Sequence, residues 1–223
     1  MSFYDDLIEA TVADRAALYL APAIQASLEG KVTREMYLAF LNQAYHHVKH
    51  TTPLLMAVGA RLPDRLTWLR WPVAEYIEEE IGHEEWILDD IAAAGGDTAD
   101  VYAGAPGLAT EVMVAYAYDL VNRRNPVGFF GMVFVLEGTS VALALKAADL
   151  IQRALDLPDT AFSYLRSHGT LDQVHTQHLA ELVNRMEPDD QAEVLRAARV
   201  FFKLYGDVFR TLPVQQREAV TWN

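Results

Sequence analysis

The segment from His168 to His175 carries three side chains that could bind a metal ion together. It reads His-Gly-Thr-Leu-Asp-Gln-Val-His, and at 100° per residue His168, Asp172 and His175 fall within about 60° of one another on a helix face. Two imidazoles and a carboxylate that point in one direction make up half of a two-metal site. The segment therefore predicts that other ligands come from elsewhere in the chain.

Glu137 is the clearest of these other candidates. It follows Phe-Phe-Gly-Met-Val-Phe-Val-Leu and precedes Gly-Thr-Ser-Val-Ala-Leu-Ala-Leu. An ionised carboxylate in such surroundings is costly unless it is paired or bound to a metal. The alternative is a buried glutamate partnered by an arginine or a tyrosine.

A Glu-x-x-His pair, Glu80 and His83, lies in the acidic segment 78–85. Most of this charge is expected on a solvated helix face. Glu79 and Glu80 both share a face with His83, and the sequence favours Glu80 only slightly. Six ligands on three segments are about what two iron or manganese ions require in a helical protein. The predicted metal ligands are Glu80, His83, Glu137, His168, Asp172 and His175.

The remaining histidines and several aromatic residues are assigned to the surroundings of this site. His46, His47 and His50 lie on a helix rich in Tyr and Phe, which we interpret as a pocket wall rather than as a source of ligands. His178 is as consistent with a supporting or surface position as with a ligand. Aromatic side chains are expected to line the pocket, namely Tyr45, Tyr76, Phe130 and Phe134.

The composition limits which metals such a site could hold. The 223-residue chain contains no cysteine, which excludes thiolate zinc sites, iron–sulfur clusters and a cysteine nucleophile. Histidine and carboxylate donors favour iron or manganese, with zinc as an alternative. The net charge of −13 argues against nucleic acid and anionic membranes as partners, because no basic run offsets it.

No boundary divides the chain, so we predict a single domain over residues 1–223. The acidic N-terminus lacks the features of a signal peptide, which favours a cytoplasmic protein. The only candidate for a membrane span, 127–145, has Glu137 at its centre and contains several glycines, so a buried core helix is the preferred interpretation. The apolar excess of the composition is consistent with a homodimer.

Apolar residues recur with a period of 3.6 in nearly every segment between the prolines and glycines, and strand-like alternation is absent. The sequence therefore predicts an all-α bundle of about seven to eight helices. A bend is expected near Pro72. The predicted helices span 3–29, 33–51, 53–61, 64–94, 107–124, 126–156, 159–186 and 188–211.

The order Glu80-x2-His83, Glu137 and His168-x3-Asp172-x2-His175 resembles the heme-oxygenase-like di-iron oxidases. These are relatives of TenA-type thiaminases and of PQQ-synthase C, often called iron-containing redox proteins. The resemblance covers essentially the whole chain. It implies a heme-oxygenase-like fold, two non-heme iron ions held by the six residues, Glu137 as the bridging ligand, and oxidation of a small organic substrate by dioxygen. In some members the first carboxylate lies seven residues before the first histidine, where this chain has Tyr76.

Three other interpretations stay open at this point. A cofactorless oxidase like PQQ-synthase C binds its substrate with Arg, Tyr and His in a comparable cavity, without this full carboxylate set. A ferritin-like bundle would need a further inward carboxylate where this chain has His168. A metal-free helical binding protein would leave a lone buried glutamate unexplained. The absence of cysteine excludes the thiaminase chemistry, and the sequence does not distinguish decarboxylation, hydroxylation, N-oxygenation and C–C cleavage.

Overall fold

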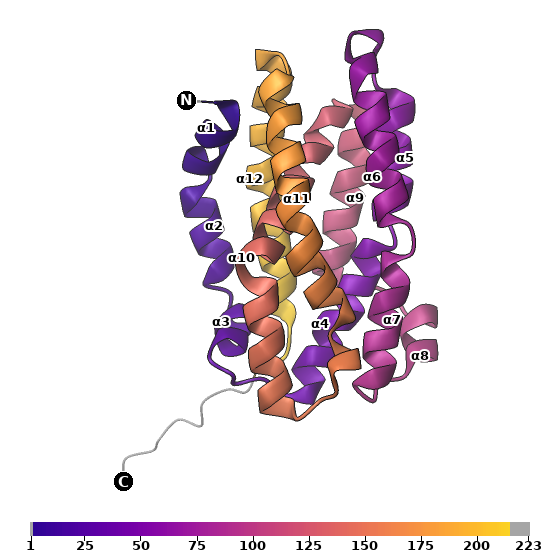
Figure 1. Ribbon diagram of the computed structural model, residues 1–223, viewed down its shortest axis with the longest axis vertical. Helices are drawn as coiled ribbons and strands as arrows, with labels where there is room; N and C mark the ends of the chain where they lie inside the picture. Colours follow the sequence, from indigo (N-terminus) through magenta and orange to yellow (C-terminus); the bar gives the residue numbers. More distant parts are fainter. Residues whose placement is uncertain (1, 215–223) are drawn as a thin grey trace.

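The computed structural model describes residues 2–214, apart from the side chains at positions 170, 171, 173 and 174. Within this range the protein is an elongated bundle of α-helices, most of them aligned with its long axis, and no strand occurs (Figure 1). The α-helices are α1 (Phe3–Ala10), α2 (Val12–Tyr19), α3 (Pro22–Leu28), α4 (Arg34–Val48), α5 (Thr51–Arg61), α6 (Arg70–Glu80), α7 (His83–Ala93), α8 (Thr98–Ala103), α9 (Leu108–Arg123), α10 (Phe129–Leu155), α11 (Ser163–Arg185) and α12 (Pro188–Thr211). Short 3-10 helices precede α6, α10 and α11 at Asp64–Leu69, Pro126–Gly128 and Asp159–Ala161.

The described residues form twelve α-helices, more than predicted, mainly because two of the long predicted helices are broken. The predicted helix 3–29 is three short helices. Pro22 starts the third of them, and Ala21 before it is extended, since a residue that precedes proline avoids the helical conformation. The short helix α8 was not predicted. The Asp97 side chain caps it by accepting a hydrogen bond from the Ala99 backbone at 2.8 Å.

The predicted helix 64–94 breaks at Gly82 rather than bending at Pro72. Pro72 lies in the first turn of α6, where proline is tolerated. Gly82 adopts φ +90°, a left-handed conformation that favours glycine, and it separates α6 from α7. Glu80 is therefore the last residue of α6 and His83 the first of α7, so the Glu-x-x-His pair lies across a turn instead of along one helix face.

The long apolar helix α10 forms the centre of the bundle and packs against α11 and α12. A Cβ atom on Gly131 would lie 2.6 Å from the Val194 carbonyl oxygen, so the close approach of α10 to α12 requires glycine at this position. By length and composition, residues 126–155 are the one described helical stretch that could cross a membrane, but 67% of its most apolar window is buried inside the protein. Its apolar character is accounted for by this burial.

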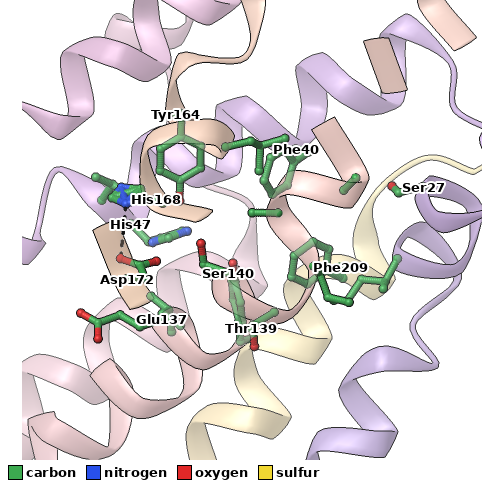
Figure 2. Close-up of a pocket in the computed structure, with 18 of the residues that line it drawn as sticks. Ser27, Phe40, His47, Glu137, Thr139, Ser140, Tyr164, His168, Asp172 and Phe209 are labelled. Atoms are coloured by element: carbon green, nitrogen blue, oxygen red, sulfur yellow. Dashed lines mark ion pairs between the residues drawn. The ribbon is translucent and has the colours of Figure 1, made fainter. Parts of the chain in front are cut away.

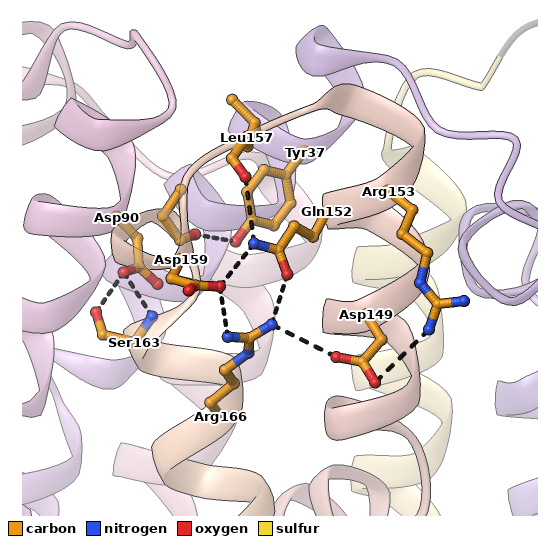
Figure 3. Close-up of polar contacts among 10 residues, drawn as sticks. Tyr37, Asp90, Asp149, Gln152, Arg153, Leu157, Asp159, Ser163 and Arg166 are labelled. Atoms are coloured by element: carbon orange, nitrogen blue, oxygen red, sulfur yellow. Dashed lines mark hydrogen bonds and ion pairs between the residues drawn. The ribbon is translucent and has the colours of Figure 1, made fainter.

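The start of α11 is attached to α7 and α10 by polar contacts (Figure 3). The buried Asp90 carboxylate of α7 accepts hydrogen bonds from the backbone N–H groups of Ser163 and Tyr164 at 2.8 and 2.9 Å. These bonds satisfy two of the free N–H groups at the helix N-terminus. Arg166, one turn on, pairs with Asp159 and reaches Asp149 of α10. The first turn of α11, which precedes His168, is thus fixed next to the helix that carries His83.

Candidate metal centre

The structure brings all six predicted ligands together as two neighbouring groups of three. The first group consists of Glu80, His83 and His168, and the second of Glu137, Asp172 and His175. Within each group one potential ligand atom per residue lies within 4.8 Å of the others. The six side chains come from the end of α6, the start of α7, and the middle parts of α10 and α11. Because α11 contributes to both groups, its attachment to α7 and α10 determines how the groups face each other.

In the first group, His83 Nδ1 lies 3.2 Å from Glu80 Oε2 across the turn at Gly82. The His83 ring stacks on Trp86 with centroids 4.0 Å apart, which fixes its plane. The His168 ring meets His83 edge to face at 4.8 Å. The two imidazoles and the carboxylate thus converge in a buried space between α6, α7 and α11.

In the second group, His175 Nδ1 lies 3.5 Å from Asp172 Oδ1 and 3.6 Å from Glu137 Oε1. The buried Tyr76 hydroxyl donates a short hydrogen bond to Glu137 Oε1. That bond leaves the other oxygen, Oε2, without a partner. The tyrosine that the sequence places seven residues before His83 therefore lies in the site and orients one of its carboxylates.

Asp172 lies between the two groups. Its Oδ1 is 3.9 Å from His168 Nδ1 and 3.5 Å from His175 Nδ1. The resemblance implies Glu137 as the bridge, but Tyr76 already bonds to one of the Glu137 oxygens. Asp172 is therefore the carboxylate that is closest to histidines of both groups.

Three buried atoms of the site lack any hydrogen-bond partner: Glu137 Oε2, His168 Nε2 and His175 Nδ1. Buried polar atoms are nearly always paired, so a cluster of unpaired ones calls for a missing partner. The donor set of three carboxylates and three imidazoles matches what iron and manganese bind. The residues therefore fit a pair of metal ions, which would give these atoms their partners.

In the metal-free site the ionisation of Glu137 and that of His175 depend on each other, because the two side chains lie 3.6 Å apart. Burial is the main cause that raises the pKa of Glu137, since it penalises the charged form. Burial opposes protonation of His175, but the neighbouring carboxylates of Asp172, Glu137 and Glu79 outweigh it and raise the pKa of His175. Without metal, His175 is thus held as an imidazolium ion among carboxylates. A bound cation would take over this role.

A cavity with a volume of about 150 Å³ extends from the candidate metal centre between α3, α4, α10 and α12. Figure 2 shows Glu137, Asp172 and His168 at one end, with Phe40 and Phe209 toward the other. Its walls are largely apolar. The aromatic side chains that line it are Tyr37, Phe40, Tyr76, Phe129, Tyr164, Tyr205 and Phe209.

The cavity wall differs in part from the predicted one. Of the predicted aromatic side chains, Tyr76 lines the cavity, whereas Tyr45, Phe130 and Phe134 are buried elsewhere in the core. Phe130 follows Phe129, and one residue turns the side chain by about 100°, away from the cavity. Ser140 and the aromatic wall residues other than Tyr76 were not named individually, although Phe40 lies on the helix interpreted as a pocket wall. Apolar spacing alone does not say which side of a packed helix faces a cavity.

The remaining predicted residues take distinct places. The helix that carries His46, His47 and His50 is a wall, as interpreted from the sequence, and of these histidines only His47 lines the cavity. His178 is exposed at the surface of α11. Glu79 is 47% exposed, and its Oε2 lies 3.1 Å from His175 Nε2. It therefore contacts the site from outside.

Residues 38–206 match the protein family described as iron-containing redox enzymes. Among solved structures the chain is similar to a domain of unknown function with a heme oxygenase-like fold from Shewanella denitrificans, at 24% identity and a TM-score of 0.86, over 95% of this chain and 92% of that chain. It is also similar to a TenA homologue from Pseudomonas syringae, at 13% identity and a TM-score of 0.76, over 93% of this chain and 90% of that chain. A further similar structure is heme oxygenase from Leptospira interrogans, at 16% identity and a TM-score of 0.72, over 95% of this chain and 100% of that chain. No curated protein matches the chain. The predicted all-α, heme-oxygenase-like fold is confirmed.

Proposed function

The chain belongs to the iron-containing redox enzymes, and from this premise we propose that it is a non-heme di-iron oxidase or oxygenase that uses dioxygen to oxidise a small organic molecule. The observation that carries the proposal is the pair of buried ligand groups, Glu80 with His83 and His168, and Glu137 with Asp172 and His175. Heme iron takes one or two axial side chains, whereas six donors that include three carboxylates suit two non-heme ions. Manganese is the alternative metal.

The protein's own residues would prepare this site before any reaction. Tyr76 holds Glu137 by one oxygen, Trp86 fixes the His83 ring, and the Glu79 carboxylate lies 3.1 Å from His175 Nε2. Bound ferrous ions would supply the electrons that reduce dioxygen. Asp172, which lies near histidines of both groups, would be among the residues that hold the ions. Substrate would enter through the cavity, whose walls are largely apolar.

The cofactorless alternative has less support. It would bind a substrate with Arg, Tyr and His side chains, of which the cavity lining supplies tyrosines and histidines. The described residues that line the cavity include no arginine and no lysine. They include instead four of the six candidate ligands, Glu80, Glu137, His168 and Asp172.

Anaerobic loading with ferrous iron tests the proposal. We expect close to two iron ions per chain by elemental analysis, and rapid oxygen uptake on mixing with air-saturated buffer that ends in a ferric protein. Chelator-treated protein and zinc-loaded protein serve as controls and should consume no oxygen. An iron-free preparation that oxidises organic substrates with dioxygen would instead support the cofactorless alternative, and protein that retains no iron at all would support a binding protein.

A further inference from the structure

Apart from the candidate metal ligands, the described cavity lining carries two buried polar atoms that no protein group satisfies. His47 is 2% exposed, and its Nδ1 has no hydrogen-bond partner. The Ser140 Oγ is also buried and unpartnered. Both residues line the cavity, from α4 and α10 respectively, and Figure 2 shows the His47 ring pointing toward Ser140 near the metal end. Neither residue is among the six candidate ligands.

Two other aliphatic hydroxyl groups of the same wall, those of Ser27 and Thr139, are already used. The Ser27 hydroxyl donates to the Ala23 carbonyl at 2.8 Å, and the Thr139 hydroxyl donates to the Val135 carbonyl at 2.6 Å. Such bonds to the preceding turn are the usual solution for a buried serine or threonine in a helix. Ser140 does not adopt this solution, and buried polar groups that stay unpaired are disfavoured. Its hydroxyl is therefore available to a ligand in the cavity.

The cavity offers no partner for a charged ligand beyond the metal centre itself. The described residues that line it include no lysine or arginine, and its only carboxylates are the candidate metal ligands. Burial, followed by the nearby His168, lowers the pKa of His47 to about 3, so this imidazole is neutral. From His47 and Ser140 the cavity continues past Phe40 and Phe209, where a charge would lie in apolar surroundings.

We propose that His47 and Ser140 form a polar subsite for an uncharged amphipathic substrate, whose hydroxyl, carbonyl or amide group lies between them and whose apolar part extends toward Phe40 and Phe209. The inference deepens the proposed function, since it names the class of molecule that the metal centre would oxidise. A ligand hydroxyl can donate to the imidazole and accept from the serine at the same time. The subsite would thereby place the carbon atoms next to the polar group close to the metal centre.

Octan-1-ol is a suitable probe, because it has one hydroxyl and a flexible apolar chain. Its binding to the full-length, chelator-treated protein can be measured by calorimetry, alongside octanoate and octylammonium. We expect octan-1-ol to bind at least tenfold more tightly than either ion at pH 7. Ser140→Ala should weaken its binding about 3- to 10-fold, the loss of one hydrogen bond. Ser27→Ala is the matched control, because the Ser27 hydroxyl lines the same cavity but already donates to the Ala23 carbonyl. This variant should bind octan-1-ol with an affinity within twofold of the wild type.

The outcomes separate this proposal from the di-iron proposal. Equal affinities of Ser140→Ala and the wild type for octan-1-ol, tighter binding of either ion, or no binding of octan-1-ol would each overturn the subsite, whatever the iron content. Protein that binds octan-1-ol in a Ser140-dependent manner but takes up no iron would retain the subsite and refute the di-iron centre.

Discussion

The Nε2 atom of His175 lies 3.1 Å from Oε2 of Glu79, while the opposite nitrogen of the same ring faces Asp172 and Glu137. Glu79 and Glu80 are adjacent at the end of α6, yet they serve different histidines, since Glu80 contacts His83. A carboxylate behind a metal-binding histidine fixes its tautomer and increases the basicity of the ligand nitrogen. Of the two glutamates between which the sequence left the choice open, Glu80 belongs to a candidate ligand group, whereas Glu79 contacts His175 from outside both groups.

Glu79→Ala should lower the affinity for one of the two iron ions by about 10- to 100-fold, because His175 loses the group that orients it. Anaerobic titration against a competing chelator measures this. Glu78→Ala is the matched control, because Glu78 is a neighbouring exposed glutamate of the same helix. Unchanged binding of both ions in Glu79→Ala would show that the contact with His175 is incidental.

Glu137→Gln should reduce the iron content while it leaves the iron-free protein as stable as the wild type, or more stable. The amide keeps the size of the side chain and an acceptor for Tyr76, but it removes a carboxylate whose charged form is penalised by burial. Elemental analysis measures the iron content, and thermal unfolding of the chelator-treated protein measures the stability. Full iron occupancy would contradict the role of Glu137 as a ligand.

Single alanine substitutions at His168, Asp172 and His175 should each abolish oxygen uptake by protein treated with ferrous iron. His178→Ala should retain most of it, because this histidine of the same helix is exposed and lies outside both ligand groups. An oxygen electrode and the iron content of each variant supply the comparison. Loss of iron from His178→Ala would place that residue in the site after all.

The contrast between the metal ligands and the cavity wall shows what the sequence could predict. Glu137 is recognisable because a carboxylate in an apolar segment is costly to bury unless it is paired or bound to a metal. His168, Asp172 and His175 are recognisable because their spacing places them on one helix face. Phe40 and Tyr45, in contrast, are five residues apart on α4, hence about 140° apart around the helix, and neither side chain is exposed. Only the packing of the other helices determines which of them faces the cavity. The same holds for Ser140, whose unpaired hydroxyl has no signature in the sequence.

The stability of the iron-free protein should depend on pH through His175. Its pKa in the folded protein is raised to about 10, compared with about 6.5 in the unfolded chain. The resulting stabilisation is complete below pH 6.5 and disappears as the pH rises through 10. The melting temperature of chelator-treated wild type should therefore fall between pH 7 and 10 more steeply than that of His175→Gln. Parallel curves for the two proteins would exclude a raised pKa at His175.

Gly82→Ala should destabilise the protein by about 1–2 kcal/mol, the cost of a left-handed conformation for a residue with a Cβ atom. Because Gly82 at φ +90° forms the turn that brings Glu80 and His83 together, relief of this strain would move the two ligands apart. Iron should therefore be lost from the first group before the second.

Gly138→Ala is the matched control, since this helical glycine lies next to Glu137 and an added Cβ would meet no atom within 4 Å. We expect it to keep its iron and to gain stability, because alanine favours a helix. If Gly82→Ala bound two ions as tightly as Gly138→Ala, the turn would not be what positions Glu80 and His83.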